Sequence, residues 1–202
     1  MNCTPFLKIT VLASLTSCMM AACGEGSETS TKDTVTTSEK SKEVAEEKND
    51  AKFNKPAEKD AQFLVDAYSS GLMEVKAATN AAVKATNKDV KDFAAMLVAA
   101  HEKVNGQIQT TAASKNISLP TGPTDSQNSK LTKWMKETGH EYDKDFIDMM
   151  VSGHKDGVNL YEKIASDATD ADIKAWAAQT LPDLRKHLDI ANATWDKIKN
   201  MK

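Results

Sequence analysis

Tyr142 to Ala168 reads YDKDFIDMMVSGHKDGVNLYEKIASDA, and its apolar residues follow a helical period. Apolar or small residues recur every three or four positions along it: Tyr142, Phe146, Met149, Met150, Gly153, Gly157, Leu160 and Ile164. This spacing is typical of the buried stripe of an amphipathic helix. His154 lies near the middle of this helix, beside the stripe. Such a stripe has to be covered by other elements of the same chain.

Other segments on both sides repeat this plan and predict an all-α fold. Long helices are predicted at 57–86, 88–115 and 170–198, and a short helix at 126–138. No segment shows the alternation typical of strands. No internal repeat is expected beyond the similar lengths of the long helices. We therefore predict an antiparallel four-helix bundle with one short extra helix between its second and third long helices.

Each long helix carries one ionisable residue near its middle: Glu74, His101, His154 and His187. Antiparallel helices of equal length have their midpoints at one level of a bundle, so these four side chains are expected in one layer. Metal sites in four-helix bundles are built in this way, from inward side chains on facing helices. Three imidazoles and one carboxylate suit a transition metal ion, namely copper, zinc or iron.

Met150 stands one turn before His154 and is a candidate additional ligand. Its thioether would favour copper over iron, whereas packing in the apolar core is the alternative role. The whole layer also has a metal-free alternative, a buried polar cluster in which Glu74 pairs with a protonated histidine. His140, the chain's fourth histidine, falls in a helix junction and is expected to be exposed.

The N-terminal residues 1–22 have the composition of a lipoprotein signal peptide. Their apolar run, ITVLASLTSCMMAA at 9–22, ends on two alanines directly before Cys23, and a polar segment follows. We therefore expect a lipid on Cys23. The sequence before Cys18, LTS at 15–17, also fits a lipobox and by residue type fits it better. We prefer Cys23, because cleavage before Cys18 would leave the apolar residues 19–22 on the mature chain and shorten the apolar run. An ordinary signal peptide on a soluble periplasmic protein is the alternative.

Residues 23–56 contain almost no large apolar side chain and are predicted to form a disordered tether. The folded domain is expected to occupy residues 57–202. A lipid on Cys23 would make the membrane a partner through the N-terminus and would place the protein in the cell envelope, facing the periplasm or the cell surface. An envelope protein is a further expected partner.

Charge and motifs argue against several classes of function. The formal net charge of -3 provides no basic surface for nucleic acid. All three cysteines lie within the first 23 residues, so the predicted domain has no disulfide and no thiolate nucleophile. Hydrolase, phosphate-loop and dinucleotide-binding motifs are absent. The sequence therefore favours a binding protein over an enzyme.

Four motifs resemble a bacterial family of domains of unknown function, family 4142. They are FLVDAYSSGLME at 63–74, FAAMLVAAH at 93–101, FIDMMVSGH at 146–154 and LPDLRKH at 181–187. The resemblance covers residues 61–193 and implies an exported or outer-membrane protein with a ferritin-like four-helix bundle.

The chain departs from the related patterns at four positions. Family members commonly carry Asp directly before the histidines of the second and third helices, where this chain has Ala100 and Gly153. Ferritin-like di-iron enzymes carry Glu three residues before the histidine on two helices, where this chain has Val98 and Leu184. A standard di-iron carboxylate site is therefore not expected.

Three functions agree with these observations. The first is a lipid-anchored metal-binding module that buffers or senses a transition metal. The second is a ferritin-like redox enzyme with altered ligands. The third is a metal-free stress or interaction protein whose helical surface binds an envelope partner. Stoichiometric metal without turnover would favour the first, consumption of oxygen or peroxide the second, and a co-purified partner without metal the third.

Overall fold

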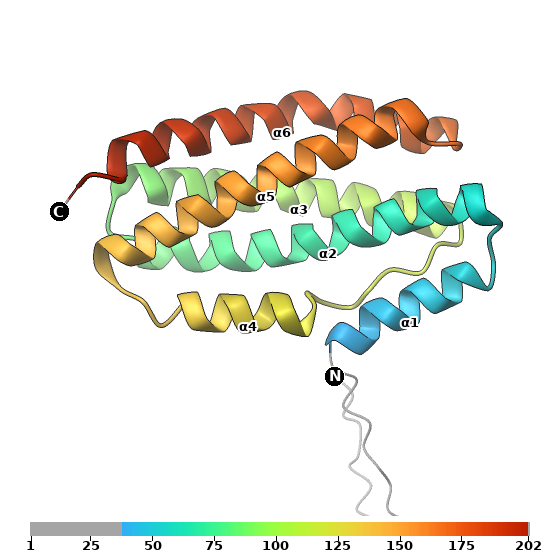
Figure 1. Ribbon diagram of the computed structural model, residues 1–202, viewed down its shortest axis with the longest axis horizontal. Helices are drawn as coiled ribbons and strands as arrows, with labels where there is room; N and C mark the ends of the chain where they lie inside the picture. The colour runs from blue at the N-terminus through green and yellow to red at the C-terminus, as the bar shows by residue number, and fades with distance from the viewer. Residues whose placement is uncertain (1–37, 202) are drawn as a thin grey trace, which may run out of the picture. The chain divides into compact units, whose positions relative to one another are not determined.

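The computed structural model describes residues 38–201, and every regular element in that range is a helix (Figure 1). The helices are α1 (Ser38–Asp50), α2 (Lys55–Lys84), α3 (Lys88–Ser114), α4 (Asp125–Trp134), α5 (Gly139–Asp167) and α6 (Ala171–Ile198). The predicted all-α class is confirmed. The predicted long helices correspond to α2, α3, α5 and α6, and the predicted short helix corresponds to α4. Within this range no helix has both the length and the apolar character needed to cross a membrane.

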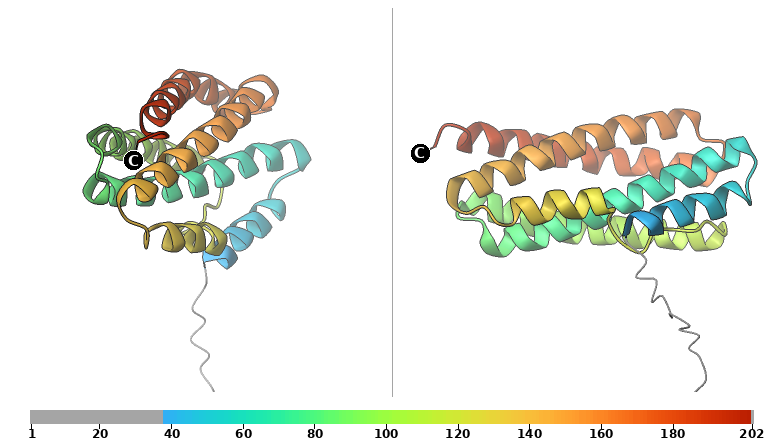
Figure 2. Two further views of the ribbon diagram at one scale, coloured as in Figure 1. Left: turned by 60° about the vertical axis from the view of Figure 1, so that its left-hand side comes forward. Right: turned by 60° about the horizontal axis from the view of Figure 1, so that its bottom comes forward.

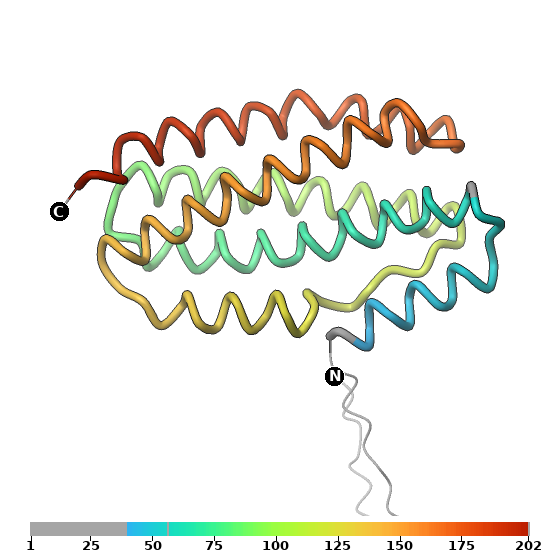
Figure 3. Tube along the Cα trace, in the orientation of Figure 1, coloured from blue at the N-terminus to red at the C-terminus, as the bar shows by residue number. Residues whose placement is uncertain are grey.

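The four long helices pack as two antiparallel hairpins, α2–α3 and α5–α6 (Figure 1). Each hairpin turns through a short connection, at 85–87 and at 168–170, which makes neighbouring helices antiparallel. The hairpins meet where α2 contacts α5 and where α3 contacts α6. A longer connection, 115–124, returns the chain from the end of α3 to α4 (Figure 3). These contacts fit the predicted bundle, and its likeness to ferritin stays a prediction.

The apolar core consists of two clusters, one toward each end of the long helices. The first contains Phe93, Trp134, Tyr142 and Phe146, with the Trp134 and Tyr142 rings stacked at 4.5 Å between centroids. The second contains Phe63, Tyr161, Leu181 and Leu184, among others. In every long helix the predicted mid-helix residue falls between the segments that supply these two clusters. The polar layer therefore separates the two halves of the core.

Helix α1 corrects the predicted tether over residues 23–56. It lies beside α2 and α4 (Figure 2), and its Ala45 is only 3% exposed. Asn49 exchanges two hydrogen bonds with the backbone of Ser118, at 3.0 and 2.8 Å, and Ser41 Oγ accepts one from the Thr121 amide at 3.0 Å. The prediction counted large apolar residues, whereas polar contacts dock this helix. Residues 23–37, with the proposed lipidation site at Cys23, lie outside the described range.

An aspartate near the start of α5 binds the turn of the other hairpin. Asp143, which is 1% exposed, accepts hydrogen bonds from the Thr86 amide at 3.0 Å, from Thr86 Oγ1 at 2.6 Å and from the Asn87 amide at 2.7 Å. These amide groups precede α3 and have no helical partner of their own. Asp143 therefore fastens the α2–α3 turn to α5.

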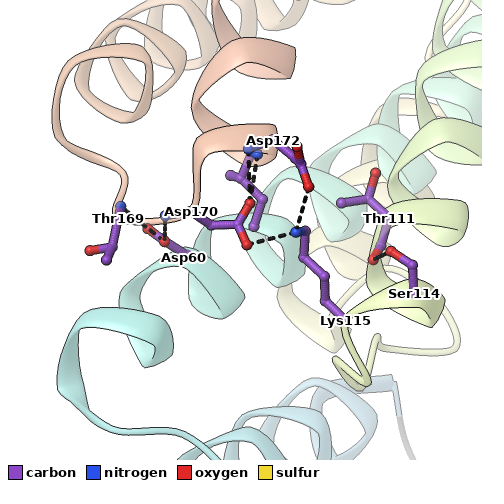
Figure 4. A network of polar contacts seen from close by, with 8 residues as sticks. Asp60, Thr111, Ser114, Lys115, Thr169, Asp170 and Asp172 are labelled. Atoms are coloured by element: carbon purple, nitrogen blue, oxygen red, sulfur yellow. Dashed lines mark hydrogen bonds and ion pairs between the residues drawn. The ribbon is translucent and has the colours of Figure 1, made fainter.

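A carboxylate on α2 makes the equivalent contact with the turn of the α5–α6 hairpin. Asp60 on α2 accepts from the amides of Thr169 at 3.0 Å and Asp170 at 2.7 Å, at the turn between α5 and α6 (Figure 4). Lys115 at the end of α3 joins this network through ion pairs of 2.6 Å to Asp170 and 3.0 Å to Asp172. Each hairpin thus begins with a carboxylate that holds the turn of its neighbour.

These matching contacts show an internal repeat with a constant offset of 83 residues (60 to 143 and 87 to 170). Asn87 caps α3 by accepting from two backbone amides, and Asp170 caps α6 in the same way. Phe63 and Phe146, both core residues, are related by the same offset (63 to 146). The expectation of no internal repeat was wrong. The repeat is hard to see in the sequence, because most positions related by this offset hold different residues.

Candidate metal centre

The four predicted layer residues come together at the centre of the structure, one from each long helix. Glu74 is 7% exposed, His101 4%, His154 1% and His187 7%. The ring centroids of the three histidines are 5.3, 5.6 and 5.4 Å apart, and one nitrogen of each ring lies within 4.8 Å of the others. The predicted common level is therefore present in the fold, and the three imidazoles form its centre.

Hydrogen bonds donated by the Nδ1 atoms assign the tautomers of two rings. His154 Nδ1 lies 2.9 Å from the Met150 carbonyl oxygen, which can only accept. His101 Nδ1 lies 3.0 Å from Glu74 Oε2, a carboxylate oxygen that also accepts. Both Nδ1 atoms therefore carry the proton in the neutral rings, which leaves a lone pair on each Nε2.

These two Nε2 atoms face each other at 3.3 Å. Burial lowers the pKa of His101, and this effect outweighs the opposing charge of Glu74, so at neutral pH His101 has no proton to place between the two lone pairs. A tetrahedral metal ion with bonds of 2.0–2.1 Å to two imidazoles would hold their nitrogens about 3.3 Å apart. The observed spacing is therefore compatible with a cation shared by both rings.

His187 supplies the third imidazole. Its buried Nδ1 has no hydrogen-bond partner in the described structure. Burial, and after it the neighbouring His154 and His101, lower the pKa of His187 to about 4. The ring is therefore neutral at pH 7 and keeps its affinity for metal ions.

Glu74 and Met150 occupy positions behind the imidazoles. Glu74 Oε2 binds His101, and its Oε1 lies 4.0 Å from His154 Nδ1. The side chain of Met150 is fully buried in the apolar cluster with Phe146, while its carbonyl oxygen orients His154. Histidines that bind metals almost always donate their other N–H to a carboxylate or a backbone carbonyl. Glu74 and Met150 provide these two acceptors.

One protein-family model matches most of this chain. Residues 42–194 match the model of a family described as Domain of unknown function (DUF4142). The chain belongs to the DUF4142 family. This confirms the resemblance seen in the four motifs. No curated protein and no solved structure matches it.

The sequence alone did not predict that small residues make room for the polar layer of Glu74 and the three histidines. A Cβ atom on Gly153 would lie 3.1 Å from Glu74 Oε1, so a larger residue there would require the carboxylate to shift by a few tenths of an ångström. A Cβ on Gly71 would lie 2.1 Å from Asn105 Oδ1, one turn away from the pair of Glu74 and His101. The only signal in the sequence is a glycine on a helical stripe, which by itself does not indicate a neighbour.

The metal-free protein should lose stability as pH falls, because His187 is neutral when folded and titrates near 6.5 when unfolded. The unfolded state binds the extra proton below pH 6.5, so the contribution is lost between pH 6.5 and 4. The loss from this residue should be about 3 kcal/mol. Urea unfolding of chelator-treated protein at pH 7, 5.5 and 4.5 measures it. His187→Leu should show a smaller loss, and identical pH dependences would contradict the expectation.

Proposed function

We propose that this DUF4142 protein is a lipid-anchored protein of the cell envelope that binds one transition metal ion within a ferritin-like four-helix bundle. The ligands are Nε2 of His101, Nε2 of His154 and a ring nitrogen of His187. The observation that carries the proposal is the 3.3 Å separation of two Nε2 atoms whose Nδ1 partners are already engaged. Glu74, expected from sequence as a ligand, acts instead as the carboxylate that orients His101.

The donor set favours copper, zinc or iron, because neutral imidazole suits all three metals. Three protein ligands leave a further coordination position for water or another small ligand. The layer holds a single carboxylate, and Val98 and Leu184 stand where a di-iron site would have glutamates. We therefore favour binding of one ion, for buffering or sensing, over a di-iron redox enzyme.

Metal ions have a route to the histidines. A cavity of about 480 Å³ between α3 and α6 is lined by His101 and His187. Lys103, Lys186 and Asp183 also line it. The two histidines can thus exchange ligands with solvent without opening the apolar clusters, and an entry path is one requirement of a usable metal site.

A metal-free interaction protein is the second candidate, favoured by the close pairing of Glu74 with His101. Calorimetric titration of chelator-treated protein with zinc, copper and ferrous iron separates the two. We expect one ion per chain with micromolar or tighter affinity for at least one metal. If nothing binds below about millimolar, which corresponds to roughly 4 kcal/mol, the layer is structural and the metal proposal is wrong.

The lipid anchor is tested by the mass of the mature protein. Because the apolar run ends at Cys23 and a polar segment follows, mass spectrometry should find an N-terminal Cys23 carrying two or three acyl chains. Cys23→Ser should remove the lipid and release the protein from the membrane fraction, whereas Cys3→Ser should not. A mature N-terminus at Cys18, or one without lipid, would contradict the proposal.

A further inference from the structure

A second cavity lies on the other side of the layer, with α2 and α5 supplying most of its lining. Its volume is about 200 Å³, and Glu74, His154 and Tyr161 are among the residues that line it. Gly157 lies between His154 and Tyr161 on α5, and a Cβ atom there would meet no atom within 4 Å. The space between the imidazole and the phenol is therefore open because residue 157 has no side chain.

Tyr161 brings a hydrogen-bond donor to this cavity. The residue is only 5% exposed and lines the cavity. Its ring is held by Phe63 at 5.0 Å and Trp176 at 5.6 Å between centroids. Burial and the negative charge of Glu74 both raise the pKa of the hydroxyl, so it stays protonated and can donate.

Glu74 brings the complementary acceptor. Its Oε2 accepts from His101, while its Oε1 lies 4.0 Å from His154 Nδ1, which already donates to the Met150 carbonyl. Oε1 thus keeps acceptor capacity toward the cavity. The remaining lining includes the apolar Ala67, Val104, Leu160 and Leu184, and the exposed Ser70 and Asp156 also line the cavity. The cavity therefore combines apolar walls with a few polar groups, the usual composition of a small-molecule site, and Glu74 and Tyr161 are its buried acceptor and donor.

We propose that this cavity binds a small, uncharged organic molecule that carries a hydroxyl group. The hydroxyl would donate to Glu74 Oε1 and accept from Tyr161, while the apolar part packs against the leucines. A cavity of roughly 150 Å³ is enough for benzene, so the observed volume admits a single substituted ring and little more. The carboxylate of Glu74 excludes anions by charge repulsion. The site does not require the metal ion, because all of its contacts come from the chain.

Phenol is the probe that fits this description. Titrated into the full-length, chelator-treated protein, it should bind one molecule per chain with a millimolar or tighter Kd. Benzene, which lacks the hydroxyl, should bind about tenfold more weakly, and benzoate should not bind. Tyr161→Phe should weaken phenol binding about five- to tenfold and leave benzene binding unchanged, a pattern that mere loss of packing would not produce.

Gly157→Leu tests the location of the site. Leucine should fill the cavity and abolish phenol binding without lowering the melting temperature, since leucine also has a higher helix propensity than glycine. Gly106→Leu is the matched control, because Gly106 also lies in a helix, has open space at its Cβ and is absent from the cavity. Both variants should keep the metal affinity of the wild type.

Two results would overturn this inference. One is the absence of saturable phenol binding up to tens of millimolar, and the other is undiminished phenol binding by Gly157→Leu. Metal titration of the same samples separates this failure from that of the proposed function. If metal binds and phenol does not, only the cavity proposal is wrong. If phenol binds and metal does not, only the metal proposal is wrong.

Discussion

Replacing His187 with leucine should remove most of the metal affinity and almost none of the folding free energy. In the metal-free protein the His187 ring is neutral at pH 7, and its buried Nδ1 has no hydrogen-bond partner. An apolar side chain of similar volume leaves no other polar group unpaired, so the change should be neutral or slightly stabilising. In the proposed site one nitrogen of this ring is one of three ligands. Its loss should weaken metal binding at least about 100-fold, more than typical losses of outer partners.

Two measurements on chelator-treated protein decide this case. Calorimetric titration gives the metal affinity, and thermal unfolding with and without metal gives the stabilisation that binding to the folded state must produce. His140→Ala is the control, since His140 lies outside the layer, and it should keep the wild-type affinity. If His187→Leu retains the metal affinity, or if no metal raises the melting temperature of the wild type, the three-histidine centre is wrong.

His154→Ala separates the metal site from the polar-cluster alternative. It removes a ring whose Nδ1 donates to the Met150 carbonyl, so it should cost about 1–3 kcal/mol of stability with or without metal. Only the metal proposal also predicts the loss of binding. Comparing His154→Ala with His187→Leu therefore distinguishes a lost hydrogen bond from a lost ligand.

The second large effect should come from Asp143→Ala, which removes the acceptor shared by two backbone amides and one hydroxyl at the α2–α3 turn. Asp143 is 1% exposed, so water cannot easily replace the carboxylate. Hydrogen bonds to charged groups contribute about 1.5–3 kcal/mol each and are not additive within one group. We expect a loss of about 3–5 kcal/mol in the free energy of unfolding, measured by urea denaturation.

Asp148→Ala is the matched control for Asp143→Ala. It removes the same charge from the same helix at an exposed position, and it should change stability by less than about 0.5 kcal/mol. Asp60→Ala should resemble Asp143→Ala, because Asp60 holds the turn of the other hairpin. Equal effects of Asp148→Ala and Asp143→Ala would show that helix charge, and not the bound turn, accounts for the loss.

The polar layer could be predicted because helical period and chain direction are enough to place it. Each of Glu74, His101, His154 and His187 lies near the middle of its helix, and antiparallel hairpins bring helix middles to one level. Period fixes the face of a helix but not which atoms meet. The sequence therefore could not show that Glu74 lies behind His101.

Other features escaped prediction because they depend on contacts between distant segments. Helix α1 is docked by side chains such as Asn49, whose partner Ser118 lies 69 residues away. The space beside Gly157 is defined by what surrounds a missing side chain, which no single-sequence pattern records. Neither feature follows from local composition, the only guide available for residues 38–50 and for an isolated glycine.

The constant offset of 83 residues shows that the two hairpins carry different residues at matching positions of the layer. Under this offset Glu74 corresponds to Gly157, His101 to Leu184, Gly71 to His154 and Val104 to His187. For each of the four polar residues of the layer, the matching position of the other hairpin therefore holds glycine or an aliphatic residue. The position that matches Glu74 is Gly157, so the layer has a single carboxylate and an open space where the second hairpin could have placed another.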